Sequence, residues 1–180
     1  DLRNNPGGYL HATTQMLGTF HPTVTQYAYM ENARGELEPL QTIVTQSDNT
    51  LSTFLQTTPI VILQNGGSAS ASEVFAAALK KWDVATIIGE KSFGKGTVQE
   101  TWPLSNGGEM KLSTHKWLTL DREWIHQKGI SPHIEQSAHP LQQIQLKIIS
   151  KDYTLGDFSE DIAYVQQVLD ALGYASTRTD

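Results

Sequence analysis

The sequence predicts an α/β fold, and three neighbouring segments near the middle of the chain carry that prediction. Residues 59–63 form an unbroken apolar run rich in β-branched side chains, which is typical of a strand buried on both faces. Residues 73–79 are rich in good helix formers, and residues 84–88 form a second short strand-like run. The order strand, helix, strand agrees with an α/β fold.

Four elements are expected before this unit. Residues 8–18 are predicted to form a helix that ends near a glycine, and residues 20–30 alternate weakly as a strand. The turn-forming residues 32–35 lead to a second strand at residues 40–44. The polar residues 46–50 are expected to form a loop.

The chain after this unit is predicted to be rich in strands and then helical. Residues 98–104 and 110–120 are expected to form two strands, because Ser-Asn-Gly-Gly between them is a strong hairpin signal. From about residue 138 the character changes. Residues 160–172 place apolar side chains on one face of a predicted helix, and Gly173 is its expected stop.

Composition narrows the classes of protein. The hydrophobic content of 38% suffices for a packed core, and no apolar stretch is long enough for a transmembrane helix. A net charge of −6 without a basic patch argues against nucleic-acid binding. The absence of cysteine excludes disulfides and thiolate metal sites, and it suits bacterial extracytoplasmic and cytosolic proteins alike. We expect neither a metal nor a cofactor.

A turn with three serines, Ser68, Ser70 and Ser72, joins the first strand to the helix. The unpaired amides and positive dipole at a helix N-terminus can stabilise an oxyanion beside a serine hydroxyl, as acyl transfer requires. The alternative is a capping box of Ser70 and Glu73, with the hydroxyl bonded to backbone amides. These residues alone leave both open.

Lys95 stands between two glycines, where the backbone can bend tightly and direct the amine inward. A lysine that acts as a general base must lose its proton near neutral pH, and burial favours this loss. We therefore expect Lys95 to be buried beside Phe93 and Val98. The pair Gly7-Gly8 forms either a simple turn or a loop whose amides face a ligand.

Three separated motifs, DLRNNPGG at 1–8, SASASE at 68–73 and FGKGTVQ at 93–99, resemble those of carboxyl-terminal processing, or tail-specific, serine proteases. The resemblance covers roughly residues 1–136 and implies a ClpP/crotonase-like α/β core. In that family a helical region, a PDZ domain and earlier strands precede these motifs. We therefore expect this chain to be a fragment of a longer protein.

The resemblance also assigns roles to single residues. It makes Ser70 the nucleophile, Lys95 the general base, and Gln99, one helical turn beyond the lysine, the side chain that holds the amine. It places the oxyanion hole at the amide of Ala71 and at one amide of the Gly7-Gly8 pair. Serine endopeptidase activity on exposed C-terminal tails of proteins or peptides follows from these roles.

The remaining segments suggest a domain order and further partners. Residues 1–137 are expected to be the protease core, 138–153 a linker, and 154–180 a helical segment that resembles the first half of a peptidoglycan-binding module. The alternative for this last segment is a helix that packs on the core. The resemblance is compatible with peptidoglycan binding, with a homodimer and with an extracytoplasmic location of the parent protein.

Two other interpretations stay open. Six histidines are scattered along the chain, so a Ser/His/Asp triad assembled in space is a rival mechanism, although none of them lies in a motif of its own. The chain is alternatively a non-catalytic peptide-binding or cell-wall-binding fragment of such a protease.

Overall fold

The structure is a computed structural model that describes residues 1–21, 23, 25–44, 49–145, 147–149 and 151–174. The chain divides into two compact units, Asp1–Gln136 and Ser137–Asp180.

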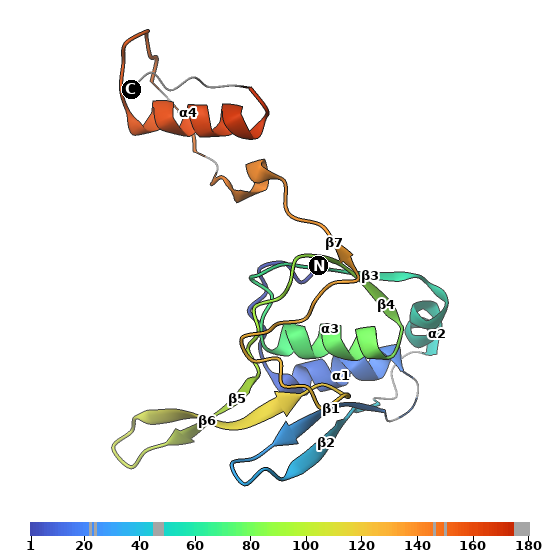
Figure 1. The fold of residues 1–180 in the computed structure, drawn as a ribbon. Coiled ribbons are helices and arrows are strands. Elements are labelled where there is room, and N and C mark those ends of the chain that lie inside the picture. Colours follow the sequence, from blue (N-terminus) through green and yellow to red (C-terminus); the bar gives the residue numbers. More distant parts are fainter. Residues whose placement is uncertain (22, 24, 45–48, 146, 150, 175–180) are drawn as a thin grey trace. The chain divides into compact units, whose positions relative to one another are not determined.

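A three-stranded parallel sheet in the first unit has the order β3-β4-β7 (Figure 1). Its strands are β3 (Ile60–Gln64), β4 (Ala85–Gly89) and β7 (Ile134–Glu135), and helix α3 (Ala71–Lys81) connects the first two. The register runs from Ile60 opposite Ala85 to Gln64 opposite Gly89. This arrangement confirms the predicted α/β fold.

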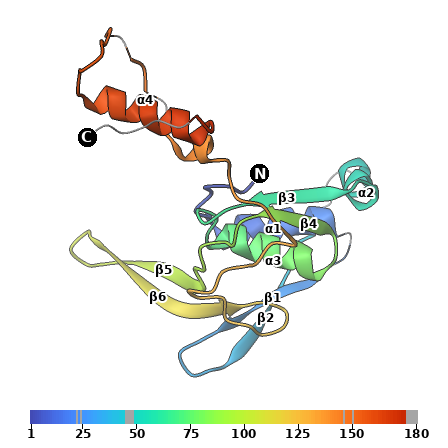
Figure 2. The same cartoon turned by 45° about the horizontal axis from the view of Figure 1, so that its top comes forward.

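Strand β3 is buried on one face only, so the prediction of two buried faces is wrong. Ile62 and Gln64 are buried, whereas the side chain of Val61 between them is 51% exposed. The reason is that helices pack against one side of this sheet in the described part of the first unit (Figure 2). The apolar run in the sequence could not distinguish these cases.

A four-stranded antiparallel sheet of order β2-β1-β6-β5 forms the other side of this unit. Two hairpins build it: β1 (Gln26–Glu31) with β2 (Leu37–Gln41), and β5 (Thr97–Pro103) with β6 (Glu109–Leu118). The predicted turns at residues 32–35 and 105–108 are therefore confirmed. The outer part of the β5–β6 hairpin extends beyond the body of the unit, and residues 99–112 are exposed (Figure 1).

Helices α1 (Leu10–Phe20) and α3 lie between the two sheets (Figures 1 and 2). The core between these layers is apolar, and its largest fully buried members are Trp117, Leu17, Leu79, Ile87 and Val74. Phe20 was expected to begin a strand, but it ends α1 and packs its ring edge-on against Phe75 at 5.4 Å between centroids.

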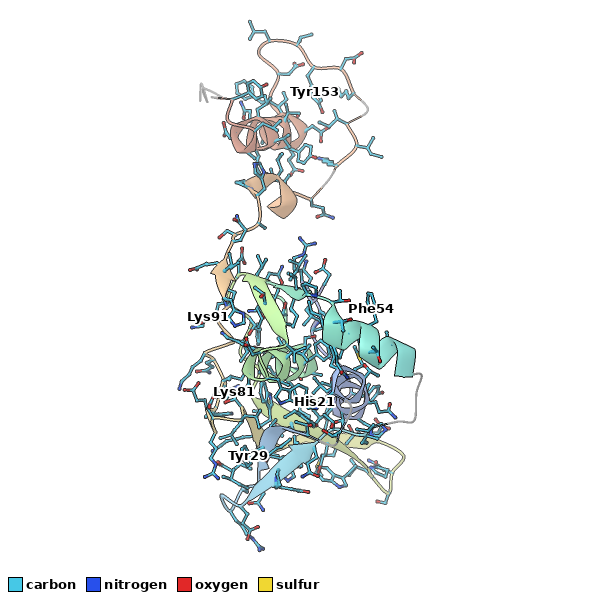
Figure 3. The ribbon with its side chains drawn as sticks, turned by 90° about the vertical axis from the view of Figure 1, so that its right-hand side faces the viewer. His21, Tyr29, Phe54, Lys81, Lys91 and Tyr153 are labelled. Carbon is cyan, nitrogen blue, oxygen red and sulfur yellow. The ribbon has the colours of Figure 1, made fainter. Side chains whose placement is uncertain are left out.

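A third difference from the sequence prediction is helix α2 (Asn49–Thr57). Asn49 and Thr50 were assigned to a loop and instead begin this helix, while residues 46–48 lie outside the described residues. Phe54 points outward from α2 and is 57% exposed (Figure 3).

The second unit contains a 3-10 turn at Pro140–Gln143 and helix α4 (Glu160–Ala171). Ser159 caps α4, since its Oγ accepts the N–H of Ile162 at 3.2 Å. Tyr153 Oη donates to a carboxylate oxygen of Asp161 at 2.6 Å (Figure 3 labels Tyr153). No described residue of α4 is buried. None of the helices in the described ranges is long and apolar enough to cross a membrane.

Candidate active site

Ser70 stands at the N-cap of α3 in a backbone conformation that is rare for a residue with a side chain, with φ +56° and ψ −119°. Such a conformation costs on the order of 1–3 kcal/mol and persists only where neighbouring contacts hold it. Ser70 is half-buried, whereas Ser68 and Ser72 are 1% and 5% exposed. The turn therefore presents Ser70 and buries its two neighbours.

In the capping box of Ser70 and Glu73, the side-chain hydrogen bond is accepted by the glutamate carboxylate. The N–H of Ser70 donates to Glu73 Oε2 at 2.8 Å. The two residues are arranged as a capping box, in which the N–H of Glu73 donates to the main-chain oxygen of Ser70 at 2.8 Å and the Ser70 hydroxyl makes no cap hydrogen bond. The hydroxyl is therefore not used by the helix cap.

The Glu73 carboxylate is 1% exposed and joins the serine turn to the lysine loop. Its Oε2 accepts the N–H groups of Ser70 and Lys95, both at 2.8 Å. Its Oε1 accepts the Ser92 hydroxyl at 2.6 Å and the N–H of Gly94 at 2.7 Å. Because two bonds meet at Oε2, the amide nitrogens of Ser70 and Lys95 lie within about 5.6 Å of each other.

The Lys95 loop is held from its other side by two indoles. Trp117 Nε1 donates to the carbonyl of Lys95 at 2.9 Å, and Trp124 Nε1 donates to the carbonyl of Gly96 at 2.8 Å. A side chain at Gly96 would meet the Trp124 ring nitrogen and a main-chain nitrogen at 2.8 Å. The glycine that follows the lysine is therefore required by close packing.

The Lys95 amine differs in its surroundings from the sequence prediction. Lys95 is half-buried, and Phe93 is 64% exposed and does not line the cleft around the lysine, although Val98 does. Nζ donates to Gln99 Oε1 at 3.3 Å. The residues are not one helical turn apart, because Gln99 belongs to strand β5.

The loop at Gly7 lies directly against the serine turn. Gly7 has φ +93°, and a Cβ there would come within 2.7 Å of the Ala71 nitrogen. The N–H of Gly7 donates to Asn5 Oδ1 at 2.9 Å. Within the described residues the amides of Gly8 and Ala71 have no hydrogen-bond partner, so these two are the amides that remain open to a ligand.

All six residues named from the sequence line one cleft of about 490 Å³. The residues that line it are Pro6, Gly7, Gly8, Tyr9, Leu10, Ser70, Ala71, Val74, Lys95, Thr97, Val98, Gln99, Thr101 and Lys111. No hydrogen bond joins Ser70 Oγ to Lys95 Nζ in this part of the chain. Catalytic hydrogen bonds are often formed only once substrate is bound, so this does not separate the pair functionally.

No histidine lines this cleft in the described part of the chain. His126 lies behind the lysine loop, where its ring stacks on Trp124 at 5.0 Å and Nδ1 accepts the N–H of Gly96 at 3.4 Å. The described residues contain no cluster of three potential metal ligands. Among the described residues that line the cleft with Ser70, the basic side chains are therefore lysines and not histidines.

Comparison with known proteins identifies the family. The model of peptidase family S41 matches residues 1–136. This chain belongs to peptidase family S41. It is 36% identical over 174 residues to the carboxy-terminal processing protease CtpA of Bacillus subtilis. This match covers 97% of this chain and 36% of that protein. A CtpA-like serine protease of Staphylococcus aureus is 37% identical over the same length, with 97% and 34% covered.

Solved structures with a similar fold support the architecture. The photosystem II D1 C-terminal processing protease superposes with a TM-score of 0.64 at 30% identity, over 78% of this chain and 34% of that one. Mature CPAF in complex with lactacystin is 15% identical with a TM-score of 0.58, over 74% of this chain and 38% of that one, and shows a likeness of fold only. The S41 chain described here spans about a third of the length of the curated relatives it matches.

Sequence reasoning placed Glu73 outside the catalytic set and did not single out Trp117 or Trp124. The only signal for Glu73 was its position three residues after Ser70, which a plain capping box shares. Its bonds to Ser92, Gly94 and Lys95 come from the fold. The two tryptophans gave no signal in the sequence, because their partners are backbone carbonyls.

Proposed function

We propose that this S41 chain carries the catalytic site of a serine endopeptidase that cleaves proteins near their C-termini through an acyl-enzyme. The observation that carries the proposal is the shared carboxylate oxygen of Glu73, which holds the backbones of Ser70 and Lys95 together at the floor of one cleft. Two relatives named as C-terminal processing proteases support the same activity.

The proposed reaction follows from the placement of the groups. Lys95 Nζ takes the hydroxyl proton of Ser70 as Oγ attacks the scissile carbonyl, and the new oxyanion accepts the N–H groups of Ala71 and Gly8. The tetrahedral intermediate then expels the amine, which takes the proton from Nζ and leaves an acyl ester on Oγ. Water, activated in the same way, hydrolyses that ester. Gln99 holds the lysine amine in position through its Oε1.

The test is labelling with a serine-directed phosphonylating probe between pH 6 and pH 10, with the adduct located by peptide mass spectrometry. We expect one adduct per chain on Ser70, and its loss in Ser70→Ala and Lys95→Ala. Two variants are matched controls: Ser72→Ala lies in the same motif, and Lys91→Ala lies on the exposed surface. In both, Ser70 should be labelled as in the wild type. Labelling of Ser70 that persists in folded Lys95→Ala would refute the dyad.

Substrates, partners and location are part of the same proposal. We propose that substrates are proteins or peptides with exposed C-terminal tails and that the parent protein acts outside the cytoplasm, with a homodimer as its candidate assembly. Cleavage of a peptide with a free C-terminal tail, compared with the same sequence placed inside a folded domain, tests the substrate class. Sedimentation of the chain tests the dimer.

A second candidate function concerns the second unit. We propose that α4 contributes to peptidoglycan binding, because it leaves Val165, Leu169 and Leu172 39%, 37% and 51% exposed on an apolar face. Co-sedimentation of the chain with purified peptidoglycan should then fall in Leu169→Glu and persist in Ser70→Ala. A chain that stays in the supernatant with peptidoglycan present would refute this function.

A further inference from the structure

The cleft carries positive side chains and no negative ones. Among the described residues that line it, the basic residues are Lys95, the proposed base, and Lys111, and no aspartate or glutamate is present. The chain as a whole has a net charge of −6, so the charged side chains of the cleft have the opposite sign to the net charge of the chain. Charges of one sign in a cleft with low-dielectric walls raise the local concentration of ligands of the opposite sign.

Lys111 lies on the projecting β5–β6 hairpin, directly opposite Thr101 in the antiparallel register. Side chains of directly paired residues share one face of a sheet, and successive residues alternate between faces. Gln99, Thr101 and Lys111 line the cleft, which makes this the cleft face of the hairpin. Its opposite face carries a second pair, Trp102 and Met110.

The side-chain amine of Lys111 has no ion-pair or hydrogen-bond partner within the described residues. Other lysines differ: Lys81 pairs with Asp121 at 2.6 Å, and Lys116 pairs with Glu31 at 2.8 Å. Two carboxylates lie close to Lys111 in the hairpin and neither neutralises it. Glu109 is on the same face but about 7 Å further along the strand towards the turn, and Glu100 is on the opposite face, 3.9 Å from His115.

The register gives an approximate distance along strand β5 inside the cleft. Thr97 begins this strand and lines the cleft with Ser70 and Lys95, and Thr101 lies four residues further along. At about 3.3 Å per residue these four residues span roughly 13 Å. An extended peptide that lies along β5 covers this distance with about four residues. If the scissile bond lies beside Thr97, a group three or four residues away comes within reach of Lys111.

We propose that Lys111 is a specificity-determining residue, which selects substrates with a carboxylate three or four residues from the scissile bond. This inference rests on the proposed function, with cleavage at Ser70. The carboxylate is supplied either by an aspartate or glutamate side chain or by the free C-terminus of a short tail, and both present the same anionic oxygens to the ammonium group.

The experiment compares matched peptides on the full chain. One series carries a single aspartate or asparagine at each position from two to six residues on either side of the cleaved bond, and a second ends in a free carboxylate or an amide. Cleavage is measured as kcat/KM, and binding to Ser70→Ala is measured by fluorescence anisotropy. We expect a preference for the anionic peptide of about two- to fivefold, the range of a partly exposed ion pair. The preference should shrink in 1 M salt.

Lys111→Gln should abolish this preference, and Lys91→Gln, the same change at an exposed lysine outside the cleft (Figure 3), should keep it. The series in which the preference is found identifies the source of the carboxylate. Equal or undetectable binding of both peptides by Ser70→Ala, or a preference that survives in Lys111→Gln, overturns the inference. Failure of the proposed function is a separate result: neither peptide is cleaved, while Ser70→Ala still binds the anionic one more tightly.

Discussion

Replacement of Glu73 by glutamine keeps the size of the side chain but removes its charge and turns one acceptor oxygen into a donor. At Oε2 the donors are the main-chain N–H groups of Ser70 and Lys95, which cannot turn away. At Oε1 one donor is the Ser92 hydroxyl, which can rotate, and the other is the N–H of Gly94. We therefore expect the glutamine oxygen at the Oε2 position and its NH₂ group at Oε1.

The cost follows from this orientation. The buried N–H of Gly94 loses its acceptor, which costs about 1–3 kcal/mol, and each of the two bonds kept at Oε2 loses the benefit of a charged acceptor, about 1 kcal/mol each. The free energy of unfolding should fall by about 3–5 kcal/mol, a large part of the 5–15 kcal/mol that is usual for a domain. Glu73→Ala, which leaves all four donors without an acceptor, should cost more.

Two measurements check this prediction. Denaturation in urea gives the change in the free energy of unfolding, and the rate of phosphonylation of Ser70, measured without denaturant, reports how well Lys95 is aligned. A misplacement of about 1 Å lowers such rates by about 100-fold, so we expect a loss of about 10- to 100-fold in Glu73→Gln. Glu38→Gln, at an exposed position on β2, is the control. Wild-type stability and labelling in Glu73→Gln would show that this carboxylate does not align the dyad.

Three further predictions concern single contacts. Gly7→Ala should remove Ser70 labelling while the chain stays folded, because the new methyl group comes within 2.7 Å of the nitrogen that begins α3; normal labelling would contradict this. Trp124→Phe should lower the maximal labelling rate about tenfold without weakening initial probe binding, since it removes the N–H that holds Gly96 and keeps an aromatic ring at this position, and an unchanged rate would exclude a positioning role. The Lys147 ammonium holds the pKa of Asp161 below its usual value, so this carboxylate stays ionised to lower pH in the folded chain; Lys147→Gln should raise that pKa in an NMR titration, and an unchanged value would exclude the ion pair.

The sequence was sufficient to predict the elements that are determined by residues close together in the chain. The strand, turn and helix around Ser70 and the Asn-Gly hairpin at residues 105–108 depend on neighbours in the chain, and the structure contains both. The six residues named for the site were found through motifs, and they line a common cleft. Their catalytic roles stay predictions, because the geometry brings the groups together without a bond between Ser70 and Lys95.

The parts that sequence reasoning got wrong depend on contacts between distant segments. Burial of Phe93 and Val61 was inferred from their apolar character, but no described segment covers them, and both are more than half exposed. Gln99 was placed by helical spacing, although the pairing of β5 with β6 puts it in a strand. The role of Glu73 depends on a loop about twenty residues further along the chain, which a capping-box pattern cannot indicate.

The cleft has two parts: one is held in place by hydrogen bonds to Glu73, and the other lies on an exposed hairpin. The backbones of Ser70 and Lys95 are fixed by the buried carboxylate of Glu73, so changes near them should alter stability and reaction rate together. Thr101 and Lys111 belong to the exposed part of a hairpin, where a side chain can change at a cost within about 0.5 kcal/mol. Substitutions on this hairpin can therefore change which peptides are preferred while the reacting groups keep their alignment. The selectivity of such a cleft can therefore vary, whereas the positions of its reacting groups cannot.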